Sequence, residues 1–405
     1  MDSYIPYGKQ LIIEDDIDEV VKVLRSDYLT QGPKVKEFED DFGKYVNADY
    51  AVAVSNGTAA LHLSILALGI KPGDKVITTT LSFSATANCI KYCGGEVLFA
   101  DIDPETYLID IKSVKSIFNH HPTNSIKGII TVDFAGKGVN LEEFRDLSDK
   151  YNCWLLQDSC HSPGGYFINS NGNKQMCGNG KYADAAIFSF HPVKHIAAGE
   201  GGMITTNNLK LAEKLRLLRT HGIEKNPERF LEVEQNLIER NCSNDTINEI
   251  PGWYMEMQYL GYNYRLTEIQ SALGCSQLKR APLGLKKRHS IAKKYIGELS
   301  RVQIIRRIPE YDEGHAYHLF VIEVNFRNKL YEYLKSKKIL AQIHYIPIHL
   351  MPYYKKESNN PNNCERAENY FKYCISLPIY PSLKEDELNH VINCIKDFDQ
   401  AIVKN

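Results

Sequence analysis

The sequence has no excess of charge of either sign. Its 405 residues include 48 Lys and Arg against 50 Asp and Glu, so the formal net charge is −2. A protein that binds nucleic acid usually carries basic patches that attract the phosphate backbone, and a balanced chain offers little such attraction. We therefore expect no nucleic-acid partner.

Long apolar runs are also missing. No run approaches the roughly 20 residues needed to cross a bilayer, and the first residues, "MDSYIPYGKQLIIEDD", have no basic start followed by an apolar core. A secretory leader has both features. The sequence therefore favours a cytoplasmic protein with no membrane partner.

The ten cysteines show no CxxC pair and no repeated spacing. Zinc sites and disulfide frameworks usually display such patterns. We therefore expect no metal site, and we expect cysteines such as Cys89, Cys93, Cys153, Cys160 and Cys177 to be free thiols in a reducing cytosol.

The chain is long enough for two or three domains, and its pattern indicates an α/β fold. Residues 12–26 and 35–46 have apolar positions at helical spacing. From residue 50, short apolar runs alternate with helical stretches such as 59–68 and 141–151. These runs are "AVAV", "KVITTT", "EVLFADI", "GIITVDF", "CWLLQD", "AAIFSF" and "GGMITT". Continuously apolar strands separated by helices predict a mostly parallel sheet that is buried on both faces.

The pattern changes near residue 280. Charged helices are predicted at 282–299, 328–337 and 385–402, around two strands, "YHLFVIEV" and "AQIHY". We therefore divide the chain into an N-terminal arm with a large domain, residues 1–280, and a small C-terminal α/β domain, residues 281–405. Residues 224–252 contain Asn-Pro, Asn-Asp and Pro-Gly pairs and predict a surface excursion.

"AVAVSNGTAALHLSILALG" predicts a strand, a tight turn at Asn56-Gly57 and a helix that starts near Thr58. The free amides of a helix start and the Thr58 hydroxyl would bind a phosphate group favourably. A capped helix with no ligand fits the same pattern about equally well.

Asp158 follows the apolar run "CWLL" and is therefore expected at the carboxyl end of a buried strand, where open α/β sheets bind their ligands. A buried carboxylate is costly unless it meets a cation or a hydrogen-bond donor, and a protonated pyridine nitrogen would satisfy it. A carboxylate that caps the following loop is the alternative. His161 could hydrogen-bond a ligand oxygen, although a lone His near a strand end is more often a satisfied polar residue.

Lys194 lies between the strand "AAIFSF" and a glycine-rich turn in "SFHPVKHIAAGEGG". A desolvated lysine loses proton affinity and can act as a nucleophile that forms a Schiff base with an aldehyde. Ser189 could supply a further hydroxyl to a phosphate. Most lysines are solvated surface charges, so the assignment depends on the neighbouring motifs.

Together these residues match the needs of pyridoxal phosphate. The phosphate would bind the helix start at Thr58, and the ring would stack on Phe83 in "TLSFSATAN". Asp158 would keep the ring nitrogen protonated, and Lys194 would carry the aldehyde as an imine. The acid and the amine thus address opposite ends of one ring.

The sequence closely resembles the sugar aminotransferases of the DegT/DnrJ/EryC/StrS family, within the aspartate aminotransferase fold group (fold type I pyridoxal phosphate enzymes). The matching motifs cover nearly the whole chain: "SNGTAALHL", "SFSATANCI", "LLQDSCHSPGG", "FSFHPVKHIAAGEGGMITT", "RTHGI", "LGYNYRLTEIQSALGCSQLKR" and "ISLPIYP". The resemblance implies a homodimer with active sites at the subunit interface. It places Gly57, Thr58, Ala59 and Ser189 at the phosphate, with Asn263 reaching in from the neighbouring subunit.

The resemblance also favours transamination. The related sugar 3-dehydratases have a His where this chain has Lys194. The amino donor is expected to be L-glutamate. Once displaced from the cofactor by this donor, Lys194 would move a proton between carbon atoms as a general acid and base, with Asp158 and His161 as the other catalytic residues.

Within the family, several segments resemble the enzymes that aminate carbon 4 of UDP-linked 4-keto-6-deoxy sugars, above all those that make UDP-4-amino-4,6-dideoxy-N-acetyl-β-L-altrosamine, a pseudaminic acid precursor. These segments are "YIPYGKQ", "SDYLTQGPKV", "VDFAGK", "WYMEMQYLGYNYRLTEIQ" and "LAQIHYIPIHLMPYY". By this resemblance the sugar and diphosphate site would be formed by Tyr7, Asp27, Tyr28, Leu29, Thr30, Arg265, His344 and Tyr345. For "HYIPIH", a core strand followed by a rigid turn is the alternative.

Two other functions stay open on the sequence alone. One is amination of UDP-4-keto-6-deoxy-D-glucose to a viosamine-type nucleotide sugar. The other is a non-catalytic sensor that keeps the fold and binds a phosphorylated ligand, against which the Asp158 and Lys194 pair argues, since a binder needs no nucleophilic amine.

Overall fold

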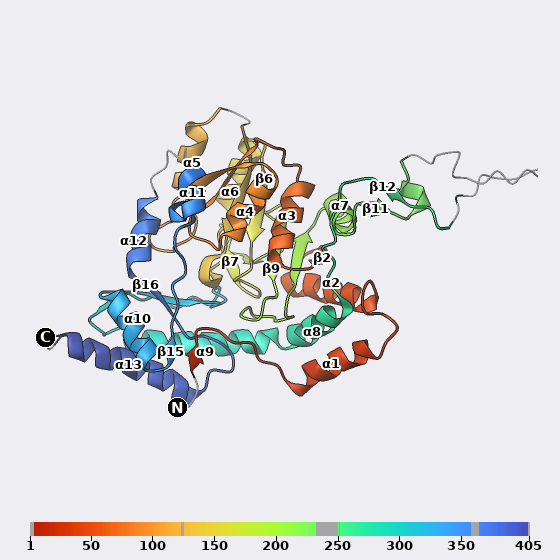
Figure 1. Cartoon of the computed structure of the whole chain (residues 1–405). Coiled ribbons are helices and arrows are strands. Elements are labelled where there is room, and N and C mark those ends of the chain that lie inside the picture. Colours follow the sequence, from red (N-terminus) through yellow and green to blue (C-terminus); the bar gives the residue numbers. More distant parts are fainter. Residues whose placement is uncertain (1–3, 123–124, 232–249, 251, 358–363, 404–405) are drawn as a thin grey trace, which may run out of the picture.

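A computed structural model describes residues 4–122, 125–231, 250, 252–357 and 364–403. Figure 1 shows a central sheet in the upper part of the molecule and a smaller helix-rich part below it, with both chain ends at the lower left. Among the described residues, no helix combines the length and the apolar composition that crossing a bilayer requires.

The central sheet has seven strands and is mostly parallel, as the sequence predicts. In spatial order the strands are β2 (Tyr50–Val54), β10 (Gly202–Thr206), β9 (Ala185–Ser189), β6 (Trp154–Asp158), β5 (Ile126–Val132), β3 (Lys75–Thr79) and β4 (Glu96–Ala100). The exception is β10, which runs antiparallel to both β2 and β9. The connection from β9 to β10, residues 190–201, contains no helix. A parallel neighbour needs a long crossover, so this short return makes the pair antiparallel.

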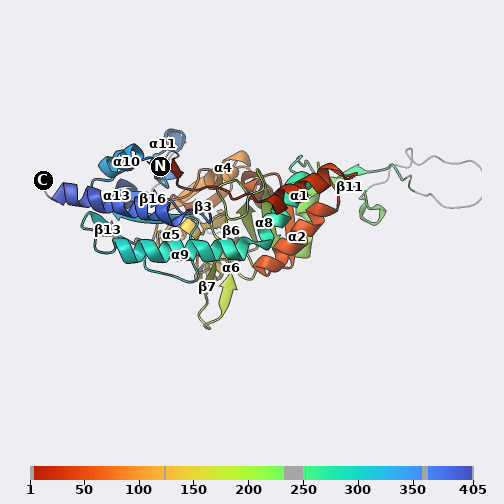
Figure 2. The ribbon, with the colours of Figure 1, turned by 90° about the horizontal axis from the view of Figure 1, so that it is seen from below.

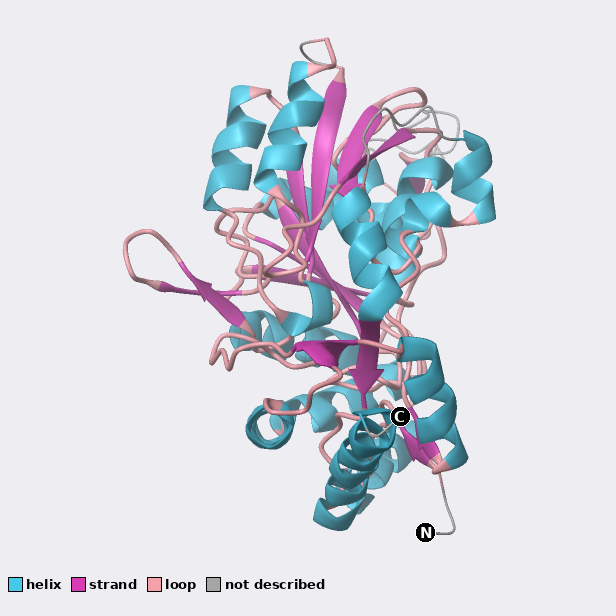
Figure 3. Cartoon of the chain, turned by 90° about the vertical axis from the view of Figure 1, so that its left-hand side faces the viewer, coloured by secondary structure: helices cyan, strands magenta, loops and turns pink. Residues whose placement is uncertain are grey.

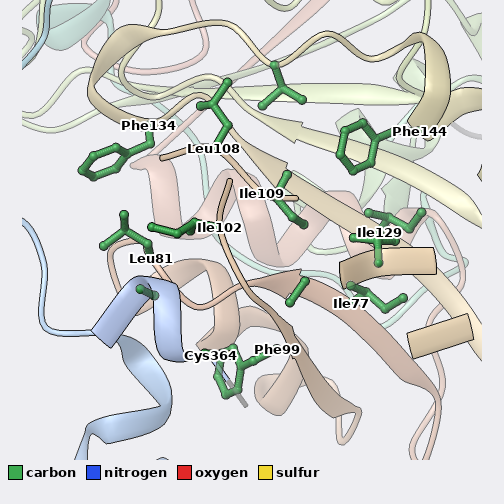
Figure 4. Packing of buried hydrophobic residues seen from close by; sticks show 14 of the residues in the cluster. Ile77, Leu81, Phe99, Ile102, Leu108, Ile109, Ile129, Phe134, Phe144 and Cys364 are labelled. Carbon is green, nitrogen blue, oxygen red and sulfur yellow. The ribbon is translucent and has the colours of Figure 1, made fainter. Parts of the chain in front are cut away.

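Helices cover both faces of this sheet, as Figure 3 shows. They include α3 (Gly57–Ala67), α4 (Ala85–Tyr92), α5 (Ile111–Asn119), α6 (Glu142–Lys150) and α7 (Leu209–Arg219). One large core cluster joins Ile77 and Ile129 of the strands to Phe144 of α6 (Figure 4). This double cover explains the continuously apolar strands of the sequence.

The small domain is built on the antiparallel sheet β13 (Ile305–Arg307), β14 (Phe320–Val324) and β16 (Cys374–Leu377). Its helices include α9 (Ala281–Leu299), α10 (Arg327–Ser336) and α13 (Glu385–Val403). The boundary predicted at residue 280 falls between α8 (Glu268–Lys279) and α9. The first strand, β1 (Ile5–Pro6), pairs in parallel with β15 (Ile339–Leu340), so Ile5 joins the core of the small domain.

The strand predicted for "AQIHY", residues 341–345, is wrong. The strand β15 ends at Leu340, and beyond it Gln342 forms an isolated bridge with Ser376. Beyond this bridge, hydrogen bonds that involve side chains take the place of strand pairing. His344 Nδ1 lies 2.9 Å from Ser376 Oγ, and the Tyr370 hydroxyl donates to the His344 carbonyl at 2.7 Å. Tertiary contacts thus override the alternating pattern and direct this segment toward the cavity described below.

Further helices and hairpins lie around these two domains. Helices α1 (Glu14–Leu24) and α2 (Pro33–Val46) match the two amphipathic helices predicted near the N-terminus. The strands β11 (Ile223–Glu224) and β12 (Glu256–Met257) form an arm that leaves the body in Figures 1 and 2. This agrees with the surface excursion predicted at 224–252, most of which lies outside the described residues. A second hairpin, β7 (Tyr166–Ile168) with β8 (Lys174–Met176), projects from the lower side of the body in Figure 2.

Candidate active site

A cavity of about 640 Å³ lies at the carboxyl ends of the parallel strands. Strands β2, β3, β5, β6 and β9 all end beside it, which is where open α/β sheets bind ligands. Eleven residues predicted for the site line this cavity. They are Tyr7, Gly57, Thr58, Ala59, Phe83, Asp158, His161, Ser189, Lys194, His344 and Tyr345.

The start of α3 forms one end of the cavity. The helix is capped by Asn56, whose side-chain oxygen accepts a hydrogen bond from the Ala59 amide at 2.8 Å. A Cβ added to Gly57 would lie 2.9 Å from Ser189 Cβ, so glycine lets the helix start approach β9 closely. Thr58 and Ser189 therefore present hydroxyls beside the positive end of a helix, an arrangement suited to a phosphate group.

Asp158 is buried at the end of β6 and is held by two donors. Its Oδ2 accepts from Thr86 Oγ1 at 2.9 Å, and its Oδ1 accepts from the Cys160 amide at 3.2 Å. Thr86 in turn lies 2.8 Å from Ser82 Oγ. Because an ionised carboxylate has about four acceptor positions, this one can accept a further bond from a ligand N–H.

Lys194 lies on the connection between β9 and β10. Its amide donates to the His191 carbonyl at 2.8 Å, which closes a turn around the lysine. Burial lowers the pKa of the Lys194 amine, an effect that the nearby Cys160 and Asp158 partly oppose. A lowered pKa increases the neutral fraction of the amine, which is the nucleophilic form.

His161 is buried beside the carboxylate and is uncharged. Burial lowers its pKa well below the usual value, and the charge of Lys194 adds to this effect. Its Nε2 lies 3.4 Å from the Tyr345 hydroxyl, and its ring centre lies 4.3 Å from that of His318. Its Nδ1 has no hydrogen-bond partner among the described residues and is therefore available to a ligand oxygen.

Aromatic side chains from both domains form the remaining wall. The ring centres of Tyr7 and His344 are 5.0 Å apart, and those of Phe83 and Tyr345 are 6.4 Å apart. Burial lowers the pKa of His344 to about 3 and raises the pKa of Tyr345, so both are neutral near pH 7. Phe83 is 61% exposed and lies at the cavity mouth.

The other predicted residues lie outside the cavity of the single chain. Asp27, Tyr28, Leu29 and Thr30 are exposed, and Thr30 bridges to Thr267. Arg265 is two residues from that bridge. Asn263 is exposed and bridges to Thr220. The structure thus brings 27–30 close to the segment that carries Arg265, and none of these residues lines the cavity of Lys194.

Some lining residues were not predicted for the site. Asn56 has the ordinary signal of a helix cap, a polar residue just before a helix. Thr86 had no comparable signal, because its partner Asp158 is 72 residues away in sequence. The others include Ser82, Cys160, His191, Glu200, His62 and Tyr264.

These residues fit pyridoxal phosphate. Gly57 lets the start of α3 lie close to Ser189, so that Thr58 and Ser189 line the same end of the cavity. Asp158 can accept a further hydrogen bond, and His161 Nδ1 is buried without a partner among the described residues. Lys194 lines the same cavity as the acid. Among the described residues, no group of three or more His, Cys, Asp and Glu side chains could hold a metal ion.

Comparison with known proteins agrees with this geometry. Residues 10–396 match the DegT/DnrJ/EryC1/StrS aminotransferase family. The chain is 35% identical to the spore coat polysaccharide biosynthesis protein SpsC of Bacillus subtilis over 407 residues, covering 97% of each chain. It is 34% identical over 385 residues to the UDP-4-amino-4,6-dideoxy-N-acetyl-β-L-altrosamine transaminase of Campylobacter jejuni, covering 94% of this chain and 93% of the other.

A solved structure shows the same architecture. Helicobacter pylori PseC, an aminotransferase involved in the biosynthesis of pseudaminic acid, superposes with a TM-score of 0.85 at 28% identity, covering 98% of this chain and 100% of the other. The chain therefore belongs to the DegT/DnrJ/EryC1/StrS aminotransferase family and is a pyridoxal phosphate-dependent transaminase.

Proposed function

We propose that the protein transfers an amino group from L-glutamate to carbon 4 of a UDP-linked 4-keto-6-deoxy sugar, with UDP-2-acetamido-2,6-dideoxy-β-L-arabino-hexos-4-ulose as the acceptor. The observation that carries this proposal is the placement of Lys194 and Asp158 in one cavity, next to a wall that contains Tyr7, His344 and Tyr345. The similarity to the Campylobacter transaminase supports the choice of sugar.

We assign a separate role in the reaction to each of the main residues of the cavity. Bound pyridoxal phosphate supplies an electron sink for the negative charge that develops on a substrate carbon. Asp158 holds the proton on the ring nitrogen, and Thr58 and Ser189 hold the phosphate. The Lys194 amine takes a proton from the carbon that bears the amino group of glutamate, and later delivers a proton to carbon 4 of the sugar.

The wall residues bind the sugar as neutral groups. With a pKa of about 3, His344 carries no charge near pH 7, so it contributes a hydrogen bond and not a cation. A diphosphate requires positive charge, and charge-assisted bonds from arginine serve this best. We therefore assign the diphosphate to Arg265 and the sugar hydroxyls to Tyr7, His344 and Tyr345.

Arg265 can serve only if the enzyme is a dimer with shared sites. Arg265, Asn263 and residues 27–30 lie outside the cavity of their own chain, next to large exposed apolar side chains. These include Leu24 at 55%, Tyr28 at 56%, Leu29 at 48%, Trp253 at 64% and Leu260 at 80% exposed. Exposed apolar patches of this kind mark interaction sites. We propose that two chains pair through this face, so that each supplies these residues to the cavity of its partner.

A cytoplasmic location belongs to the same proposal. Cys89, Cys93, Cys153, Cys160 and Cys177 are free thiols, as expected in a reducing compartment.

A second acceptor, UDP-4-keto-6-deoxy-D-glucose, would give a viosamine-type product by the same chemistry. The non-catalytic sensor is set aside, because the chain is a transaminase.

The test supplies purified enzyme, pyridoxal phosphate and L-glutamate with each keto sugar in turn, and identifies the product by NMR. We expect an amine at carbon 4 of the acetamido sugar and a kcat/KM at least roughly tenfold higher than for the glucose-derived sugar. A site that hydrogen-bonds a substrate group strongly disfavours an analogue that lacks this group. Equal or reversed kcat/KM values would reject this acceptor. Absence of 2-oxoglutarate with both sugars would reject the donor.

A further inference from the structure

Asp133 is a fully buried carboxylate that does not line the cavity. It directly follows β5 and is 0% exposed. Its amide donates to the Asp158 carbonyl at 3.0 Å. The residue therefore lies directly behind the turn, residues 158–165, that carries Asp158 and His161.

The Asp133 carboxylate accepts several hydrogen bonds, and it also interacts with the buried Cys177 thiol. Its Oδ2 accepts from Ser162 Oγ at 2.6 Å, Ser159 Oγ at 2.9 Å and Gln157 Nε2 at 2.9 Å. Its Oδ1 accepts from the Val139 amide at 3.0 Å and from the same Gln157 nitrogen at 3.2 Å. An ionised carboxylate accepts all of these bonds. The Val139 amide and Gln157 Nε2 can only donate, so Oδ1 acts as an acceptor, whereas the serine hydroxyls that face Oδ2 can donate or accept.

A buried negative charge is expensive for a fold. Burial raises the pKa of Asp133, and the two serine hydroxyls, the Val139 amide and Gln157 oppose that effect. A neutral apolar side chain would fill the same space without this cost. The specific contribution of the carboxylate is its geometry, because Ser159 and Ser162 stand on either side of Cys160 and His161.

We propose that Asp133 is a positioning residue, which fixes both ends of the turn 158–162 and thereby aims Asp158 and His161 into the cavity. The inference depends on the roles given to these two residues in the proposed function. Each serine hydroxyl is tied to one common atom, Asp133 Oδ2. The main chain adds a bond from the Ser162 amide to the Ser159 carbonyl at 3.0 Å. Removing the charge would leave the backbone turn but release both hydroxyls.

The test compares Asp133→Asn and the double variant Ser159→Ala/Ser162→Ala with wild type. In Asp133→Asn, one acceptor oxygen is replaced by an NH2 group, which meets Gln157 Nε2 or the Val139 amide, and neither of these can accept. Misplacement of about 1 Å at a catalytic group can cost ~10²-fold. We therefore expect kcat to fall roughly 10²-fold in both variants, with the KM for glutamate changed less than about threefold and an altered absorbance spectrum of the bound cofactor.

A second readout needs no cofactor. Hydrogen–deuterium exchange of the apo protein should become faster in peptides that cover 157–165 in both variants. The double variant keeps Asp133 and only shortens the side chains at positions 159 and 162. It therefore tests the positioning role even if Asp133→Asn fails to fold.

Two matched controls separate positioning from general stability. Asp101→Asn alters another buried carboxylate, which accepts from the Ile102, Arg366 and Ala367 amides, and Ser148→Ala removes a buried hydroxyl bonded to the Arg145 carbonyl. Both lie outside the cavity lining. We expect each to keep kcat and the exchange of 157–165 near wild-type values.

The outcomes are distinct. If both test variants keep kcat and exchange within twofold of wild type, or if the controls lose kcat equally, the positioning role is overturned. If wild type itself forms no adduct at Lys194, the proposed function fails, while the exchange of the apo protein still tests whether Asp133 anchors the turn.

Discussion

The residues assigned to the cofactor and those assigned to the substrate are placed very differently in this chain. Asp158 and Ser189 are the last residues of β6 and β9, and the residues around Thr58 follow β2 of the same sheet. All of them line one cavity. Arg265, Asn263 and residues 27–30 lie on partly or fully exposed segments outside it.

The comparison indicates which part of the site one chain can complete. Strand order alone brings the cofactor residues together, because the carboxyl ends of parallel strands share one edge of the sheet. The exposed segments have no such constraint and are positioned for another surface. Most residues assigned to the cofactor thus gather within one chain. Asn263, assigned to the cofactor phosphate, and Arg265, assigned to the diphosphate, lie outside the cavity of that chain.

The largest effect should come from Lys194→Ala. Without the amine, borohydride should trap no cofactor, and kcat should fall by 10²–10⁴-fold or more, the usual range for a lost general acid-base group. Mass spectrometry and turnover measure the two effects. Lys137→Ala, at a partly exposed lysine paired with Asp312, should leave both unchanged. Full turnover in Lys194→Ala would contradict the assignment of Lys194 to the cofactor.

Asp158→Asn tests the other end of the ring. The amide cannot stabilise a protonated ring nitrogen, so we expect kcat to fall about 10²–10³-fold, as for the loss of a preorganised electrostatic contact. The absorbance spectrum of the bound cofactor should change as well. A spectrum and a kcat equal to those of wild type would show that Asp158 does not contact the ring.

Arg265→Ala tests the assignment of Arg265 to the diphosphate of the UDP-sugar. Loss of a charge-assisted bond should raise the KM for the UDP-sugar roughly tenfold or more and leave the absorbance of the cofactor unchanged. The effect should separate from that of Lys194→Ala, because the two residues would serve different cavities of a dimer.

Mixing the Lys194→Ala and Arg265→Ala variants tests directly whether the partner subunit supplies Arg265. If subunits exchange and the partner supplies Arg265, half of the random pairs contain one intact site, so about a quarter of wild-type activity returns at low sugar concentration. No recovery, with exchange verified by mass spectrometry, would place Arg265 at the cavity of its own chain.

The pH dependence of cofactor capture should follow the lowered pKa of Lys194. The neutral amine becomes more abundant as pH rises through its pKa, and burial moves that pKa below the ordinary value of a lysine. The capture rate should therefore rise with pH and level off at a lower pH than for a solvent-exposed lysine. Stopped-flow absorbance of the apoenzyme with pyridoxal phosphate measures this. A midpoint at or above the ordinary lysine value would contradict the burial.

The smallest effect concerns the helix cap. Asn56→Ala should cost about 1 kcal/mol in the free energy of unfolding and should also weaken cofactor affinity, because α3 begins at the phosphate. Asn208, which caps α7 through the Leu211 amide, provides a matched control. Asn208→Ala should cost a similar free energy of unfolding and leave cofactor affinity unchanged. If the two variants bound the cofactor with equal affinity, the assignment of the phosphate to the start of α3 would be rejected.

The sequence located most of the residues that the structure gathers in the cavity, but not their supporting contacts. Asp158 and Ser189 end apolar runs, and Lys194 precedes a glycine-rich turn, so local pattern and sheet topology locate them. The contact of Thr86 with Asp158 and that of Ser162 with Asp133 depend on long-range packing that no local pattern encodes. For the same reason "AQIHY" was mistaken for a strand, since alternation describes a strand and an irregular wall segment equally well.

The antiparallel pairing of β10 with β9 limits how the loop between them can change as enzymes with this fold acquire new reactions. The loop 190–201 is closed at its base, where the Phe190 amide donates to the Gly201 carbonyl at 2.8 Å, and Gly202 pairs with both Ser189 and Val54. An insertion here would disturb a strand that is paired on both sides, with β2 and with β9. We therefore expect new reactions on this scaffold to arise by exchanging the side chain at position 194, with the length of its loop conserved.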